Sequence, residues 1–201
     1  MSKNKNEIKL DLGSLPAKVN AYKKILDNTI EYRKGWKEGL KEMIIDTLNY
    51  INDSTELGGK VIVRDHIENM EAVVLDLGRV HSGMRELIQD SDIKKTIVKT
   101  QGGLIYQQLF NGKVMVMIVY PYIDGYGEPR PPKNVEILRP EELKQGFILR
   151  HFQEFIKEVT EWEDYDDDRP NKPIIGYTQP IGFNAGKKEE IIVDEDKDVE
   201  G

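Results

Sequence analysis

The side chains best suited to proton transfer or metal binding in this sequence are three histidines, His66, His81 and His151. None of them lies at the short spacings that zinc sites use. Asp65 precedes His66 and Ser82 follows His81, so the residue types of a hydrolytic triad are present. Ser82 lacks the Gly-x-Ser-x-Gly context of a nucleophile elbow. We therefore interpret the histidines as packed or surface residues.

Three alternating aspartates, Asp164, Asp166 and Asp168, resemble the start of a calcium loop. An EF-hand needs glycine at the sixth loop position and glutamate at the twelfth. This sequence has Arg169 and Ile175 there, so the calcium interpretation fails. We interpret the aspartates as a solvated acidic surface, with a docking site for a basic partner as the alternative.

An active site assembled from distant residues is the third way in which this chain would do chemistry. Tyr106, Glu71, Asp76, His81 and Arg85 have suitable types. The sequence places no two of them together, and no nucleotide or phosphate motif is found. We predict that the protein is not an enzyme and binds no cofactor, metal or small molecule, and we keep an assembled active site as an alternative.

The charge is concentrated at one end of the chain. The net charge is -7, and residues 161–201 hold thirteen acidic and five basic side chains. Residues 1–160 are nearly neutral, so a direct nucleic-acid ligand is not expected. There are no cysteines, which favours a reducing compartment. No apolar run is long enough for a membrane span, and we expect a soluble, cytoplasmic protein.

The longest expected element is a helix over 15–52, where apolar residues recur every three or four positions. Gly35 in its interior predicts a bend. Such a helix either packs on its own sheet or, because its length exceeds a small domain, associates with another subunit. We assign Trp36 and Leu40 to that association. Residues 1–13 before the helix are expected to form an N-terminal arm.

A sheet is expected over 60–138. The dipeptide Asn111-Gly112 lies between two apolar runs and predicts a hairpin with a two-residue type I′ turn. That turn pairs Leu109 with Val114 and places apolar side chains on both faces of the hairpin. We therefore expect the sheet to be covered on both sides, either by a helix on each face or by a second subunit.

The order of elements predicts an α+β fold. An antiparallel sheet of about five strands is flanked by the long N-terminal helix and by an amphipathic C-terminal helix over 140–162. Residues 82–89 are expected to form a short helix. One domain then covers 14–162, and residues 163–201 form an acidic extended tail.

The loop at 120–133 concentrates aromatic, proline and charged residues. Such residue types are common at protein interfaces. We predict partner contacts for Tyr122, Tyr126, Arg130 and Pro131. The alternatives are a rigid connection that packs on its own sheet and the rim of a ligand cavity.

The predicted function is that of a non-enzymatic structural or assembly subunit of a larger complex. Connector, ring and tail subunits of phage particles often combine a compact α+β body with extended termini that contact neighbours. In the tail, Tyr177 and Phe183 each end an apolar-glycine-aromatic step and are the expected docking residues. The partners are other protein subunits, in a homo-oligomer or a hetero-complex. A small acidic chaperone or adaptor that binds a partner segment is the alternative.

Overall fold

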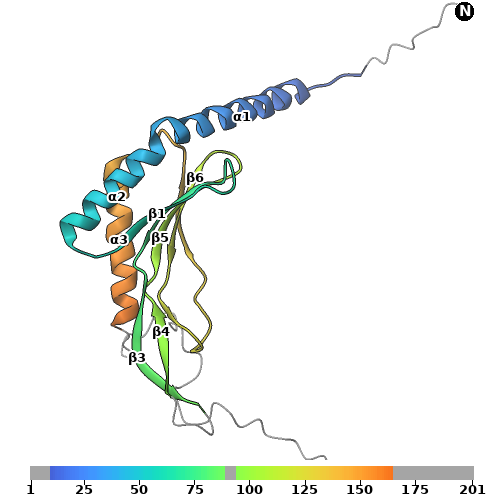
Figure 1. Ribbon diagram of the computed structural model, residues 1–201. Coiled ribbons are helices and arrows are strands. Elements are labelled where there is room, and N and C mark those ends of the chain that lie inside the picture. Colours follow the sequence, from blue (N-terminus) through green and yellow to red (C-terminus); the bar gives the residue numbers. More distant parts are fainter. Residues whose placement is uncertain (1–9, 89–93, 165–201) are drawn as a thin grey trace, which may run out of the picture.

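The N-terminal helical pattern folds into three consecutive parts. A computed structural model describes residues 10–88 and 94–164. In it, α1 (Leu15–Gly35) is followed by a π-helical turn, η1 (Trp36–Leu40), and by α2 (Lys41–Thr55). The backbone leaves helical geometry at Gly39, so α1 and α2 run in different directions (Figure 1). The predicted bend is present, four residues beyond Gly35.

The five-stranded sheet is antiparallel throughout. Its spatial order is β1-β2-β5-β6-β8. The strands are β1 (Lys60–Arg64), β2 (Ala72–Asp76), β5 (Gly103–Gln108), β6 (Val114–Val119) and β8 (Lys133–Leu138). Together with the helices, this sheet confirms the predicted α+β class.

A second sheet contains β3 (Arg79–Leu87), β4 (Lys94–Thr100) and β7 (Tyr122–Ile123). The short helix predicted at 82–89 is therefore wrong. Within this range Arg85, Glu86 and Leu87 pair with β4, and pairing with a β-branched partner strand outweighs a weak local helix preference.

The register of the β5–β6 hairpin differs by one residue from the prediction. Gln108 pairs with Val114, and the Leu109 nitrogen bonds to the Lys113 carbonyl oxygen at 2.8 Å. The loop therefore has three residues, with Gly112 alone at positive φ. A type I turn followed by a left-handed glycine has this geometry, and the one-residue shift exchanges the faces assigned to β5.

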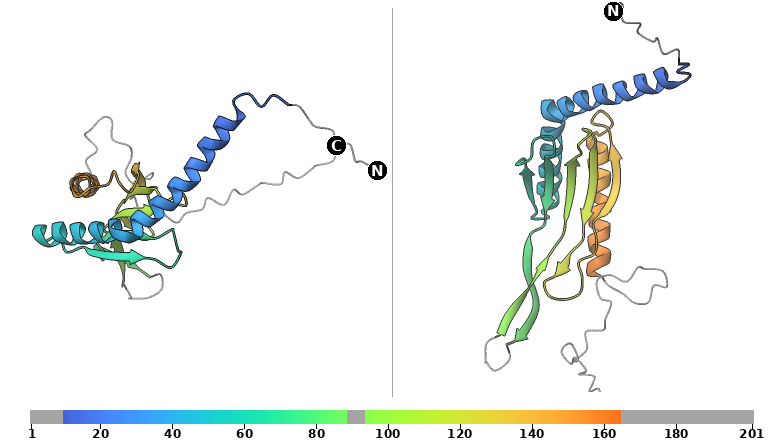
Figure 2. Two further views of the ribbon diagram at one scale, coloured as in Figure 1. Left: turned by 90° about the horizontal axis from the view of Figure 1, so that it is seen from above. Right: turned by 90° about the vertical axis from the view of Figure 1, so that its right-hand side faces the viewer.

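The helices of this chain cover one face of this sheet, so the expectation of a helix on each face is wrong, and cover of the other face by a second subunit stays a prediction. Leu104, Tyr106 and Val116 point toward α2 and α3 and are buried, and α2 and α3 lie together behind the sheet in Figure 2 (right). On the opposite face Met115 is half-buried and its neighbour Ile137 is exposed. We call this second surface the open face.

The C-terminal helix, α3 (Gln145–Glu163), begins five residues later than predicted. Residues 139–142 form a turn instead, in which the Arg139 backbone nitrogen donates to the Glu142 carboxylate at 2.7 Å. Pro140 is buried within that turn, beside Gly35. Most of the expected arm and tail lie outside the described residues, including Tyr177 and Phe183.

Candidate interaction surface

The helix α1 leaves the body of the protein (Figure 1), has no buried residue, and is exposed from Leu15 to Asp27. Only its last turns contact the body. The Arg33 guanidinium donates to the Phe110 carbonyl oxygen at 2.7 Å, and the glycine of the same hairpin loop, Gly112, lies against Thr29 and Tyr32. The β5–β6 loop therefore supports the C-terminal end of α1.

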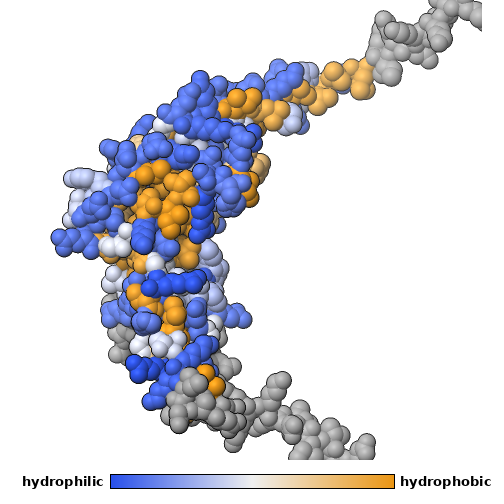
Figure 3. All heavy atoms as spheres, in the orientation of Figure 1, coloured by the Kyte–Doolittle hydropathy of each residue, from blue (hydrophilic) through white to orange (hydrophobic). Residues whose placement is uncertain are grey.

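Apolar side chains form a row on the projecting part of α1. We call Leu15, Val19, Tyr22 and Leu26 the α1 stripe. Their spacing of four, three and four residues places them on one helix face, and each is between 40% and 60% exposed. Figure 3 shows apolar side chains along this helix. No described residue covers the stripe.

The stripe continues a row that already packs against the body. Thr29 and Arg33 follow Leu26 at the same spacing, and both contact the β5–β6 loop. The α1 stripe therefore faces the same side as that loop. Phe110 at the loop tip is exposed and adds an aromatic ring near the end of the row.

Basic side chains accompany the stripe. Residues 15–26 contain Lys18, Lys23 and Lys24 and no acidic residue. The chemistry of this surface therefore suits an apolar partner surface with carboxylates around it.

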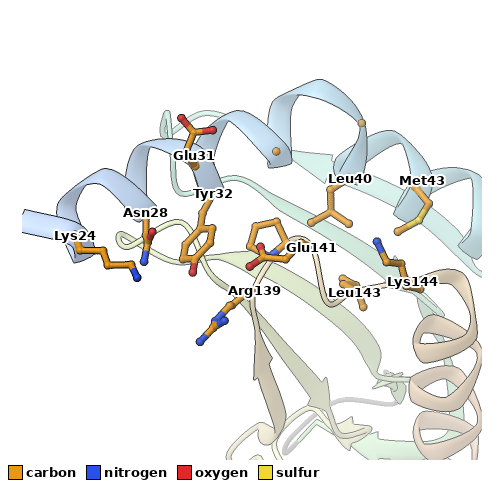
Figure 4. Close-up of a pocket in the computed structure, with 13 residues that line it drawn as sticks. Lys24, Asn28, Glu31, Tyr32, Leu40, Met43, Arg139, Glu141, Leu143 and Lys144 are labelled. Carbon is orange, nitrogen blue, oxygen red and sulfur yellow. The ribbon is translucent and has the colours of Figure 1, made fainter. Parts of the chain in front are cut away.

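An open pocket lies where α1 meets the turn at 139–142. Its volume is about 660 Å³. Cations from Lys24, Arg139 and Lys144 and carboxylates from Glu31 and Glu141 line it, and Figure 4 shows them spread around a wide opening. These groups make no close constellation, so the pocket extends the interaction surface and does not resemble a catalytic cleft.

Trp36 and Leu40 are core residues of this chain. Both are buried, so the intermolecular role assigned to them is corrected. The Trp36 indole nitrogen donates to Glu71 Oε2 at 3.1 Å, and Lys41 donates to the same oxygen at 2.9 Å. Burial alone would raise the pKa of Glu71, but these two hydrogen bonds outweigh it and lower the pKa.

The loop at 120–133 is attached to α3 at its base. The Tyr120 hydroxyl donates to Glu158 at 3.0 Å, and Lys133 lies 2.6 Å from Glu158 and 2.8 Å from Glu154. The hydrogen bonds that the Lys133 ammonium donates to Glu154 and Glu158 raise the pKa of Lys133. Arg130 stacks over the Tyr120 ring, 4.0 Å from its centroid.

The residues predicted for partner contacts in this loop are only partly available. Arg130 is half-buried on Tyr120, and Tyr122 is half-buried in β7. Tyr126 is half-buried, and its backbone nitrogen bonds to Ile123. Pro131 is exposed. A rigid loop packed on its own body accounts for most of these features, and partner binding here stays a prediction.

The side chains best suited to acid–base chemistry lie between β5, β8 and α3. The Tyr106 hydroxyl lies 3.1 Å from His151 Nδ1, and His151 Nε2 and Arg150 both contact Glu136. Burial is the largest effect on His151 and lowers its pKa, although Glu136 opposes it. The ring is therefore neutral near pH 7, with Nε2 donating to Glu136.

The tyrosine and the histidine of this group are not accessible to a substrate. Tyr106 and His151 are both fully buried, and burial raises the pKa of Tyr106, so its hydroxyl keeps its proton. We interpret the group as a structural connection between sheet and helix. The sequence signal for it is weak, because Glu136 and His151 come from separate elements.

The other residues considered for an assembled active site do not meet Tyr106. Glu71 belongs to the Trp36 contact, and Asp76 accepts a hydrogen bond from Gly78. His81 and Arg85 are exposed on β3. Within 10–88 and 94–164, no cluster of three or more histidines and carboxylates is arranged to hold a metal ion.

Comparison with protein families, with curated proteins and with solved structures finds no match for this chain. The functional argument therefore rests on the surfaces themselves. In the described part of the chain, no helix has the length and apolar character needed to cross a membrane.

Proposed function

We propose that this chain is a non-enzymatic structural subunit of a larger assembly and that it binds a neighbouring subunit through α1. The α1 stripe is the observation that carries the proposal. Single exposed apolar side chains are ordinary, but a continuous row on a helix without a buried residue is typical of a surface that another chain covers.

The energetics favour occupation of the stripe. Full burial of one large aliphatic or aromatic side chain contributes roughly 1.5–3 kcal/mol. The α1 stripe offers Leu15, Val19, Tyr22 and Leu26 together. The lysines beside the stripe favour a neighbour with carboxylates at the contact. Self-association is the first form of assembly to test.

The class of assembly that we propose first is a phage particle, with the chain as a connector, ring or tail subunit. Its support is architectural. The helix α1 and the β3–β4 sheet project from opposite ends of the body (Figure 1), so two contact elements are available to successive neighbours.

Light scattering after size-exclusion chromatography tests the proposal. The full chain is expected above its monomer mass of 23.2 kDa. Tyr22→Ser combined with Leu26→Ser should shift it toward the monomer. Ala17→Ser with Ala21→Ser is the matched control, because both alanines are exposed on other faces of α1. A full chain that stays monomeric at every concentration would contradict assembly through self-association.

An adaptor that binds an extended partner segment is the second candidate. The outer edge of β1 favours it, because no described strand pairs there. The pair Tyr22→Ser and Leu26→Ser distinguishes the two functions. An assembly subunit should lose its association, whereas an adaptor should keep its partner, because β1 is separate from the α1 stripe.

A further inference from the structure

The strand β1 is an open edge of the five-stranded sheet. It pairs with β2 on one side, and no described strand lies on its other side. Ile62 and Val63 are each 38% exposed, and Figure 3 shows an apolar area over this strand. Natural proteins usually cover or charge such an edge, since its unpaired backbone groups accept another strand.

The sequence of β1 has a simple pattern. Three aliphatic residues lie between Lys60 and Arg64. Both basic side chains are exposed, and neither forms an ion pair with another described residue. An added strand that matches β1 would carry aliphatic residues between two acids.

The chain contains such a segment outside the described residues. At 190–194 the sequence reads Glu-Ile-Ile-Val-Asp, the same pattern with the charges reversed. We propose that β1 is a strand-acceptor site and that residues 190–194 of the same chain occupy it as an added antiparallel strand. Glu190 then lies opposite Arg64, and Asp194 opposite Lys60.

Both faces of the added strand agree with this register. Lys60, Ile62 and Arg64 share the open face, because side chains alternate along a strand. Their opposite residues are Asp194, Ile192 and Glu190, so both charge pairs and one isoleucine pair lie there. Val193 and Ile191 then lie opposite Val61 and Val63 on the helix side of the sheet. Val61 packs against the core there.

Competing pairings are less favourable. The other edge strand, β8, has the charged Glu136 in its middle, so it does not match the aliphatic centre of 190–194. The second apolar stretch of the tail, 173–183, contains prolines and glycines and has no acids beside its aliphatic residues. Proline and glycine weaken strand pairing, so 190–194 is the better match.

The connecting chain is long enough for the same molecule to supply the strand. Residues 165–189 link α3 to the segment and span up to about 80 Å when extended. The sheet is about 19 Å wide from β8 to β1, given a spacing of about 4.8 Å between strands. Intramolecular pairing also has the higher effective concentration. A partner segment at this edge would have to displace residues 190–194.

Disulfide trapping tests the pairing, because the chain has no cysteine of its own. The full chain with Ile62→Cys and Ile192→Cys should oxidise to an intramolecular disulfide, since facing residues of neighbouring strands lie within bridging distance. The matched control joins Ile62→Cys with Ile175→Cys in the same tail. Equal trapping of the control, a disulfide-linked dimer or no disulfide would each overturn the proposal.

Charge exchange supplies a second test. Adding Lys60→Glu and Arg64→Glu to the Ile62–Ile192 cysteine pair should slow disulfide formation by about tenfold. Further addition of Glu190→Lys and Asp194→Lys should restore the rate. Failure of this restoration would overturn the proposed register.

Hydrogen exchange of the unmodified chain gives a readout without substitutions. The β1 amides directed away from β2 should exchange as slowly as those directed toward it, and exchange at the rate of an open edge would overturn the proposal. These experiments do not involve the α1 stripe. A negative result in the β1 experiments therefore does not contradict the proposed assembly function. Likewise, a finding that the chain does not self-associate would not contradict the pairing of β1 with 190–194.

Discussion

The hydroxyl oxygen of Tyr106 lies 3.1 Å from Nδ1 of His151, and both side chains are fully buried. This contact joins β5 to α3 in the centre of the core. Because the histidine is neutral and also bonds Glu136, the Tyr106 hydroxyl and both ring nitrogens of His151 have a partner. Removal of one partner therefore leaves a buried polar atom unsatisfied.

Tyr106→Phe should lower the free energy of unfolding by about 1–3 kcal/mol, because it leaves His151 Nδ1 without a donor. Urea unfolding measures this change. Tyr50→Phe is the control, since Tyr50 is exposed on α2 and its loss should stay within about 0.5 kcal/mol. Equal effects of the two substitutions would contradict the structural role of the contact.

Stability should fall as the pH is lowered from about 7.5 to about 5. The pKa of His151 is lowered in the folded protein, chiefly by burial. The unfolded chain therefore binds a proton near the ordinary histidine pKa of 6.5, and the folded chain does not. Protonation favours unfolding below that pH. Urea unfolding at several pH values should show a flatter dependence for His151→Gln, and an unchanged slope would refute this explanation.

Gly112→Ala should destabilise the protein more than Gly125→Ala. Both glycines have positive φ, so each alanine costs about 1 kcal/mol or more in backbone strain. At Gly112 a Cβ would also lie 2.7 Å from the Tyr32 Cβ, whereas nothing lies within 4 Å at Gly125. Crowding adds about 1–3 kcal/mol. Thermal unfolding compares the variants, and equal losses would show that the loop does not support α1.

Glu71→Ala should lower the free energy of unfolding by about 1.5–3 kcal/mol, the usual range for a hydrogen bond to a charged group. It removes the acceptor of both the Trp36 indole and Lys41. Glu68→Ala is the control, because its pair with Lys37 is exposed and its loss should matter far less. Urea unfolding followed by tryptophan fluorescence measures both.

Several elements follow from local sequence. The apolar periodicity predicted the helices, and Asn111-Gly112 correctly located a hairpin, because turn chemistry depends on adjacent residues. The register was not predictable in the same way. Within this loop only Gly112 takes positive φ. The loop lies against Thr29 of α1, so the three-residue loop occurs together with a contact to a residue far away in the sequence.

The sequence alone determined that one apolar row runs through the N-terminal helical region, because side-chain spacing along a helix is a local property. Only the tertiary structure decided what covers that row. Near Trp36 it meets the sheet and α3 and is buried, whereas from Leu15 to Leu26 the helix has left the body. Periodicity is the same in both halves, since burial depends on which distant elements pack against each residue. The contact between Tyr106 and His151 was not predictable for the same reason, since it joins residues from two distant elements.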